Sequence, residues 1–184
     1  MGQWVNVSRS FLRFLRTADL WVVRLCVASA RTSLGRHLAV AVSRVGNGGL
    51  YPALAALMIV ACGARGCYAM IAAAINIGLM HSVYPTIKRR AARVRPFRAY
   101  ADLKPLLATL DEHSFPSGHI MTLTAALVPI ALALPGTLPL ALGGWVAMAW
   151  ARLASAHHYP SDVLAGAALA LVVSYPLSRI GLAW

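Results

Sequence analysis

Three short clusters of polar residues stand out because the sequence around them is strongly apolar. In the first, Lys88 and Arg95 are two helical turns apart, which predicts both cations on one face of a helix. Pro96 disfavours helix at the preceding residue, so we expect this helix to end at Arg95. Two cations at a helix end can bind phosphate, although basic residues also flank membrane helices that have no site. The other arginines of this stretch are interpreted as contacts to lipid headgroups: Arg89, Arg90, Arg93 and Arg98.

The second cluster runs from Phe115 to His119 and predicts the start of a helix. Ser117 and Gly118 would present free backbone N–H groups there, and the helix dipole strengthens their attraction for an anion. His119 would stand beside that anion, and an imidazole can transfer protons near neutral pH. The alternative is an ordinary serine helix cap that has a histidine next to it by chance.

The third cluster runs from Arg152 to Asp162. His158 and Asp162 lie on either side of Pro160, which suits the first turn of a helix. A carboxylate beside a histidine fixes its tautomer, and such a histidine can act as a base or as a nucleophile. The alternative is that Asp162 only supplies a favourable charge at a helix start, with His157 and His158 as interfacial aromatic residues.

Uncharged stretches of the chain predict the helices that position these clusters. A helix needs about 20 residues to cross a bilayer, with a range of roughly 17 to 25. Five stretches approach or meet this length: 45–64, 66–87, the two halves of 117–151 that Pro135 and Gly136 separate, and 160–178. A short turn from Gly63 to Gly66 predicts that the first two are antiparallel. The expected fold is therefore all-α, a polytopic membrane bundle of about five spanning helices with a polar loop at 85–115.

The overall composition supports a membrane protein and argues against other classes. Of 184 residues, 59% are hydrophobic and only 12% are charged, which is unlike a soluble domain or a disordered chain. The 17 Lys and Arg outnumber five Asp and Glu, and in so apolar a chain this charge favours anionic lipid rather than nucleic acid as the partner. The three cysteines form no zinc-binding pattern.

Residues 1–44 form a basic amphipathic segment that is distinct from the bundle at 45–184. Arg9, Arg13 and Arg16 recur at helical spacing, with aromatic and aliphatic residues mostly opposite them. This pattern is typical of a helix that lies in the membrane interface, and residues 31–44 predict a second one. The alternatives are a solvated basic tail and a first spanning helix at residues 18–30.

The order of the helices predicts where the three clusters meet. Antiparallel spans place residues 85–119 and 152–162 on the same membrane face. Together the clusters supply three cations, backbone N–H groups, two histidines and one carboxylate, which suits the transition state of phosphoryl transfer. No group of carboxylates is available to hold magnesium or calcium, so we expect a mechanism without a metal or another cofactor.

These residues closely resemble the signature of the type-2 phosphatidic acid phosphatase superfamily. The match consists of Lys88 with Arg95-Pro96, then Pro116-Ser117-Gly118-His119, then Arg152 with His158 and Asp162, in the family's order and spacing. One departure is Ala151, where the family usually has serine. The resemblance implies that His158 is the nucleophile and forms a phosphohistidine, that Asp162 orients it, and that His119 is the general acid. It also implies a set of phosphate-binding residues: Lys88, Arg95, Ser117, Gly118 and Arg152.

The expected function is hydrolysis of the terminal phosphate of a membrane lipid. Family substrates include phosphatidate, phosphatidylglycerol phosphate and prenyl diphosphates, and the sequence does not choose between a monophosphatase and a diphosphatase. One alternative is a phosphotransferase that moves the phosphate to another acceptor. A second is a membrane protein that binds anionic lipid and has no enzymatic activity. The oligomeric state is left open.

The expected location is the bacterial plasma membrane, as an integral multi-pass protein. If residues 1–44 do not cross the bilayer, all Lys and Arg except Arg65 and Arg179 lie on the side of the three clusters. The positive-inside rule then favours a cytoplasmic site. Many bacterial relatives resemble enzymes that act at the outer face, so the face of the membrane stays open.

Overall fold

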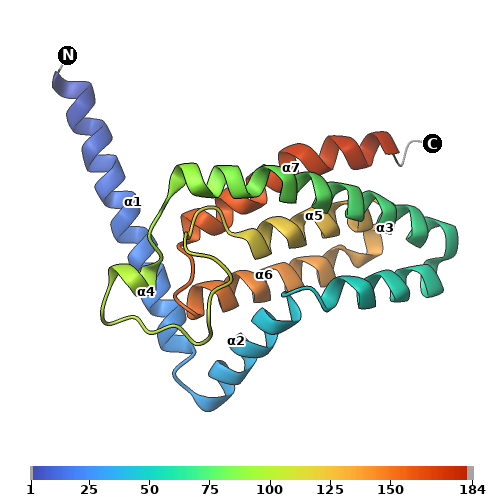
Figure 1. The fold of residues 1–184 in the computed structure, drawn as a ribbon, viewed down its shortest axis with the longest axis horizontal. Helices are drawn as coiled ribbons and strands as arrows, with labels where there is room; N and C mark the ends of the chain where they lie inside the picture. Colours follow the sequence, from blue (N-terminus) through green and yellow to red (C-terminus); the bar gives the residue numbers. More distant parts are fainter. Residues whose placement is uncertain (1, 182–184) are drawn as a thin grey trace.

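The computed structural model describes the backbone of residues 2–181 and the side chains of residues 15–181. All its elements are helices, and no strand occurs in this part of the chain, which confirms the predicted all-α fold (Figure 1). In chain order they are α1 (Gly2–Ser29), α2 (Ser33–Val45), α3 (Leu50–Ala91), α4 (Pro96–Ala99), α5 (Gly118–Ala133), the 3-10 turn η1 (Pro135–Thr137), α6 (Leu138–Ala154) and α7 (Pro160–Gly181).

Helix α3 consists of two arms that fold back on each other. Gly63 has φ 55° and ψ −132°, a conformation that glycine adopts with little strain, and the chain reverses direction there. Figure 1 shows the two arms running in opposite directions. Met58 of the first arm and Ala69 of the second are buried in one apolar cluster with Ile130 of α5. The predicted antiparallel pair is therefore confirmed.

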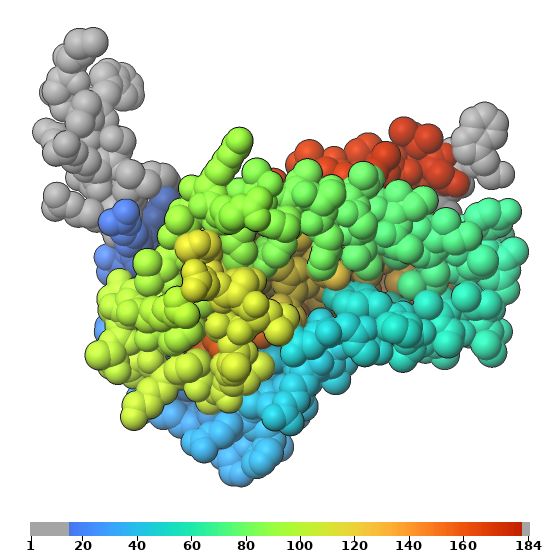
Figure 2. Space-filling view, in the orientation of Figure 1, coloured from blue at the N-terminus to red at the C-terminus, as the bar shows by residue number. Residues whose placement is uncertain are grey.

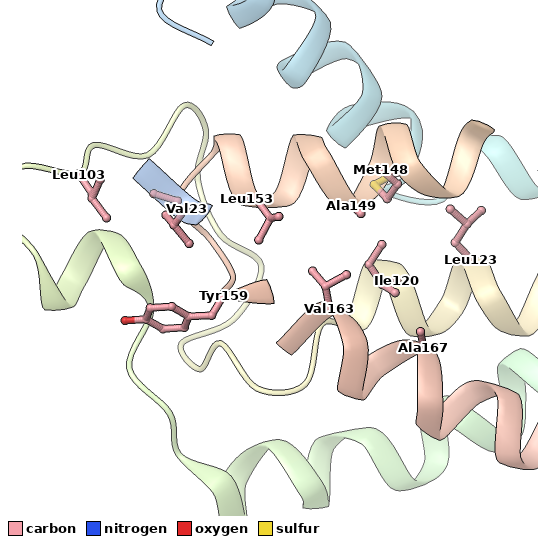
Figure 3. Close-up of a cluster of buried hydrophobic side chains, with 11 residues drawn as sticks. Val23, Leu103, Ile120, Leu123, Met148, Ala149, Leu153, Tyr159, Val163 and Ala167 are labelled. Carbon is pink, nitrogen blue, oxygen red and sulfur yellow. The ribbon is translucent and has the colours of Figure 1, made fainter. Parts of the chain in front are cut away.

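Helix α5 lies at the centre of the bundle and packs against α3, α6 and α7. Its residues Ile120 and Leu123 are buried in the largest apolar cluster, together with Met148 of α6 and Val163 of α7 (Figure 3). Because lipid tails are as apolar as these side chains, close van der Waals packing, and not removal from water, holds such helices together in a membrane. This packing holds the first turns of α5 and α7 against each other, and those turns carry two of the three clusters.

Two stretches of the structure are long and apolar enough to cross a membrane: Leu50–Ala99, which includes both arms of α3, and α7. Helix α5 is also apolar but shorter. Large apolar side chains face outward on several helices, including Val60 on α3, Leu140 on α6 and Val172 on α7. Lipid tails can cover such side chains, whereas contact of the same side chains with water would be unfavourable in free energy.

The second half of α1 and helix α2 pack against the end of the bundle. Figure 1 shows α1 lying across that end at a steep angle to the other helices, and both α1 and α2 contact α6. Val23 of α1 is fully buried in the largest apolar cluster (Figure 3). The Trp150 indole donates to the Ser29 hydroxyl at 2.8 Å. Both expected helices are present, and their position in the membrane interface stays a prediction.

Candidate active site

The three clusters come together at one end of the bundle, the left end in Figure 1. The second arm of α3 and helix α6 end there, and α5 and α7 begin there. The segment between α4 and α5, yellow-green to yellow in Figure 2, covers part of this end. A cavity of about 340 Å³ opens beneath it. Residues of all three clusters line this cavity: Lys88, Arg95, Gly118, His119, Arg152 and His158.

Lys88 and Arg95 reach the cavity from different backbone conformations. Lys88 lies in the last turn of α3, which ends at Ala91, where Ala92 takes a left-handed conformation with φ 45°. Arg95 is extended, as expected before proline, and precedes the short helix α4. The prediction that one helix continues to Arg95 is therefore wrong. Both side chains are nonetheless buried and face the same carboxylate.

That carboxylate belongs to Asp111, in the loop between α4 and α5. Its Oδ2 lies 2.7 Å from Lys88 Nζ, and its Oδ1 lies 2.5 Å from Arg95 Nη2. Tyr84 donates its hydroxyl to Oδ2 at 2.9 Å. Burial alone would raise the pKa of Asp111, but Lys88 and Arg95 lower that pKa to about 2. Asp111 is thus ionised at neutral pH and holds two cations that the motif assigns to phosphate.

His158 is almost fully buried and has a defined tautomer. Its Nδ1 lies 2.7 Å from the carbonyl oxygen of Ser114, so Nδ1 must carry the proton and donate it. Burial lowers the pKa of His158 well below its usual value, and Arg152 and Arg95 lower this pKa further. The imidazole is therefore neutral, with a free electron pair on Nε2. This Nε2 lies 3.4 Å from Arg95 Nη1.

Asp162 does not make the direct hydrogen bond to His158 that a triad would suggest. Its Oδ2 lies 3.7 Å from His158 Nδ1, and the Ser114 carbonyl takes that proton instead. The same Oδ2 accepts the backbone N–H of Tyr159 at 2.8 Å, next to the nucleophile candidate. Its Oδ1 pairs with Arg93 at 2.7 Å. The interpretation of Arg93 as a headgroup contact is therefore wrong, because its guanidinium points into the protein.

His119 is the second residue of α5 and lines the cavity. Its Nε2 lies 2.6 Å from Oδ1 of Asn47, in the turn between α2 and α3. An amide oxygen can only accept, so Nε2 carries a proton in this contact. A residue outside all three clusters therefore orients the imidazole.

Two buried donors at or next to the cavity lining have no hydrogen-bond partner among the described residues: Nε of Arg152, which lines the cavity, and the hydroxyl of Ser117, which precedes the lining residue Gly118. Buried polar groups are normally satisfied, so these atoms mark a place suited to a polar ligand. The Arg152 side chain is held by His157, whose Nδ1 accepts from Arg152 Nη2 at 2.6 Å. His157 Nε2 in turn donates to the carbonyl of Leu107 at 2.9 Å. His157 therefore positions a cation instead of facing the lipid interface.

The sequence missed several residues that complete this region: Asn47, Asp111, Ser114 and His157, and it misplaced Arg93. Most contact the clusters through loops whose course no local pattern predicts. One usable signal was the scarcity of acidic residues, because the chain has only five and Asp111 lies four residues before the second cluster. Among the described residues, no group of three or more His, Cys, Asp or Glu side chains could hold a metal ion.

Known proteins can now be compared with this geometry. The crystal structure of a transmembrane PAP2-type phosphatidylglycerolphosphate phosphatase from Bacillus subtilis is similar, with a TM-score of 0.68 and 21% identity over 97% of this chain and 95% of that one. The structure of LpxE from Aquifex aeolicus is also similar, with a TM-score of 0.67 and 20% identity over 91% and 96% of the two chains. No curated protein sequence matches the chain.

These two structures share the fold of this chain over nearly its whole length. The sequence model of the PAP2 superfamily matches residues 63–183, which is more than half of the chain and contains all three clusters. The chain therefore belongs to the PAP2 superfamily, the type-2 phosphatidic acid phosphatase superfamily that its motifs resemble, and it has the fold of the family's membrane lipid phosphatases.

Proposed function

We propose that this protein is an integral membrane phosphatase that hydrolyses the terminal phosphate of a lipid through a phosphohistidine. The observation that carries the proposal is the state of His158. Its Nδ1 donates to Ser114, its Nε2 is unprotonated and accepts only a long 3.4 Å contact from Arg95 Nη1, and three cations line the same cavity. A neutral imidazole beside cations is a nucleophile next to a site for its anionic target.

The phosphate group binds where Lys88, Arg95 and Arg152 converge. The unsatisfied Ser117 hydroxyl and Arg152 Nε supply donors for its oxygens, and the backbone N–H of Gly118 at the start of α5 adds another. Dianionic phosphate replaces the carboxylate of Asp111 on the two cations that this carboxylate holds. The cations then neutralise the equatorial oxygens of the transition state.

The first chemical step forms one bond and breaks another at phosphorus. The Nε2 electron pair of His158 attacks phosphorus, and the bond from phosphorus to the lipid oxygen breaks. His119 gives a proton to that leaving oxygen, and the dianionic phosphate beside it favours the imidazolium form that this step requires. Throughout this step Nδ1–H of His158 stays on the Ser114 carbonyl, which stabilises the positive charge that develops on the ring.

The second step returns the enzyme to its starting state. His119, now neutral, takes a proton from water while the water oxygen attacks phosphorus. The bond between phosphorus and Nε2 of His158 breaks, and inorganic phosphate leaves. Protons and charge balance between the two histidines and water, so the cycle needs no cofactor.

The walls of the cavity beyond the cations support a lipid as the substrate. Tyr51 and Ile77 of α3 line it, and we expect the arms of this apolar hairpin to face the bilayer. A lipid can therefore present its headgroup while its tails stay in the membrane. Phosphatidate, phosphatidylglycerol phosphate and prenyl mono- or diphosphates all meet this requirement. We place the protein in a bacterial plasma membrane with a cytoplasmic site, because of its strongly asymmetric basic residues.

The test is phosphate release in detergent micelles that contain EDTA, with each candidate lipid in turn. Wild type is compared with His158→Ala, and His37→Ala at an exposed position on α2 is the matched control. We expect wild type and the control to release phosphate from at least one lipid. His158→Ala should lose nearly all activity, a fall of about 10⁴-fold or more, since the nucleophile is gone.

Other outcomes separate the competing functions. Release that survives His158→Ala would disprove the nucleophile. Transfer of labelled phosphate to an added alcohol, without release to water, would indicate a phosphotransferase. Binding of anionic lipid without turnover of any lipid phosphate would favour the non-enzymatic alternative.

A further inference from the structure

Arg93 joins two carboxylates that are far apart in the sequence. Its Nη1 lies 2.7 Å from Asp162 Oδ1 and 2.6 Å from the Ser161 hydroxyl. Its Nη2 lies 2.8 Å from Asp19 Oδ2, on helix α1. The guanidinium also stacks on the Tyr159 ring, 4.0 Å from its centroid. Arg93 is thus fixed on several sides, which a headgroup contact would not require.

Asp19 extends this network from the N-terminal helix to the first turn of α7. It is buried, and its Oδ1 accepts the backbone N–H of Ser161 at 3.0 Å. Its Oδ2 also accepts the Ser161 hydroxyl. Helix α1 is therefore bonded directly to the residue that precedes Asp162. Two of the five acidic residues of the chain are used in this one network.

The network matters because Asp162 is completely buried next to the nucleophile candidate. An isolated buried carboxylate is costly, and it persists in ionised form only with a cation and hydrogen bonds. Arg93 supplies that cation on one oxygen of Asp162. The other oxygen is then directed at the Tyr159 N–H, with His158 Nδ1 3.7 Å away. The position of His158 thus depends on Asp162, and the position of Asp162 depends on Arg93.

We infer that Arg93 and Asp19 are positioning residues for the hydrolysis proposed above, holding Asp162 and through it the backbone that carries His158. Neither residue belongs to the three motifs, and Asp19 lies before the part of the chain that the family model matches. The N-terminal helix then helps to position the nucleophile through Asp19. The inference rests on the proposed function.

The experiment measures kcat, KM and inhibition by vanadate in micelles for four variants: Arg93→Gln, Arg93→Lys, Asp19→Asn and the control Arg90→Gln. Arg90 is exposed, and its replacement by glutamine removes the same charge three residues away from Arg93. Arg93→Gln should lower kcat about 10- to 100-fold, since a displaced nucleophile loses its alignment. Its KM and vanadate inhibition should stay within about threefold of wild type, because the phosphate-binding cations are untouched. Arg90→Gln should match wild type.

The remaining variants test whether the two residues act as one unit. Arg93→Lys should recover part of kcat relative to Arg93→Gln, since a lysine keeps the positive charge but lacks the planar fork of donors that contacts both carboxylates. Asp19→Asn should cost roughly 3- to 10-fold, because the amide keeps an oxygen acceptor for Ser161 but loses the charge that pairs with Arg93. In Arg93→Gln, Asp19 and Asp162 face each other without a cation. Adding Asp19→Asn to that variant should therefore cause no further loss.

Two results would overturn the inference. One is wild-type kcat in Arg93→Gln, and the other is a parallel loss of kcat and vanadate binding, which would indicate general damage to the site. Multiplicative losses in the double variant would separate Asp19 from Arg93. Failure of the proposed function is distinguishable, because in that case release would not depend on His158 in the wild-type background.

Discussion

At the residue scale, Asp111 is a carboxylate in the site that we propose for phosphate. It pairs with Lys88 and Arg95 in the position that phosphate oxygens would take. A carboxylate carries one negative charge, whereas a phosphate monoester near neutral pH carries up to two. The cations are therefore held in place by a weaker anion that the substrate can displace. This arrangement keeps buried cations compensated between catalytic cycles.

Replacing Asp111 with asparagine should tighten anion binding. The inhibition constant for inorganic phosphate is expected to fall by about threefold to tenfold in Asp111→Asn, because the phosphate no longer competes with a carboxylate. The measurement is competitive inhibition of lipid hydrolysis in micelles. Glu112→Gln, an exposed neighbour with the same charge change, is the control. Weaker phosphate inhibition in Asp111→Asn would mean that the carboxylate organises the cations instead of competing for them.

The buried histidines predict how stability depends on pH. The pKa of His158 lies well below its usual value because of burial and neighbouring cations, and burial is the main cause that lowers the pKa of His157 to about 3. In the unfolded chain both rings gain protons below about pH 6.5. The unfolded state then binds more protons than the folded state, so the free energy of unfolding falls as pH falls.

The thermal midpoint in detergent should therefore drop from pH 7 to pH 5, and His158→Asn should show a smaller drop. Asparagine can still donate to the Ser114 carbonyl but does not titrate. Each histidine contributes a slope of at most about 1.4 kcal/mol per pH unit. The control is His37→Gln on the exposed side of α2. A wild-type slope in His158→Asn would contradict a neutral buried imidazole.

At the element scale, the start of α5 is held by its packing against α7. The backbone N–H of Ser117 donates to the carbonyl of Asp162 at 3.0 Å, which ties the second cluster to the third. Gly166, one turn further along α7, lies directly against Ser117. A side-chain carbon at Gly166 would come 2.6 Å from the Ser117 carbonyl oxygen. Backbone cannot yield as a flexible side chain can, so the two helices would have to separate.

Gly166→Ala is therefore expected to reduce both stability and activity. Overpacking of this kind costs about 1–3 kcal/mol, and displacement of Ser117 should lower kcat as well. Gly144→Ala in α6 is the matched control, since a carbon there meets no atom within 4 Å. That control should be neutral or stabilising by up to about 1 kcal/mol, because alanine favours helix. Thermal unfolding and turnover of both variants in micelles make the comparison. Equal behaviour of the two would show that α7 can shift without cost.

The helices and loops differ in how well the sequence predicts them. Apolar stretches and the turn at Gly63 predicted the helices and the hairpin, since these depend on local composition and backbone preference. The gathering of His119, Arg152 and His158 followed from the helix order. The roles of Asp111 and Ser114 could not be predicted, because they lie in an irregular loop. Arg93 was interpreted as a headgroup contact because its partner Asp19 is 74 residues away in the sequence, where no local pattern relates the two.

At the scale of the whole molecule, the N-terminal segment faces two environments. Asp19 and Val23 of α1 are buried against the bundle. Trp21 on the same helix is exposed, and so are basic residues on and before α2. One side thus supports the active site, while the other is available to lipid headgroups. Removing the whole segment would combine these effects, so the test must change the exposed charges alone.

Neutralising Arg31, Arg36 and Arg44 together should weaken the use of substrate in anionic membranes without altering the chemistry. Each exposed cation near an anionic surface contributes about 1 kcal/mol, which concentrates negatively charged lipids around the protein. In vesicles that contain an anionic lipid, the apparent KM of the triple Gln variant should rise about fivefold or more at low salt. In neutral detergent micelles its activity should equal wild type. Arg179→Gln, at the opposite end of α7, is the control.

Salt separates this effect from structural damage. Exposed charges are screened at high ionic strength, where the Debye length falls to about 3 Å at 1 M salt. The difference between the triple variant and wild type in anionic vesicles should therefore shrink as salt is added. A loss that persists in high salt, or appears equally in micelles, would show that these arginines hold the fold together. Because α1 contacts the active site through Asp19, a deletion of residues 1–34 should by contrast reduce activity in micelles and vesicles alike.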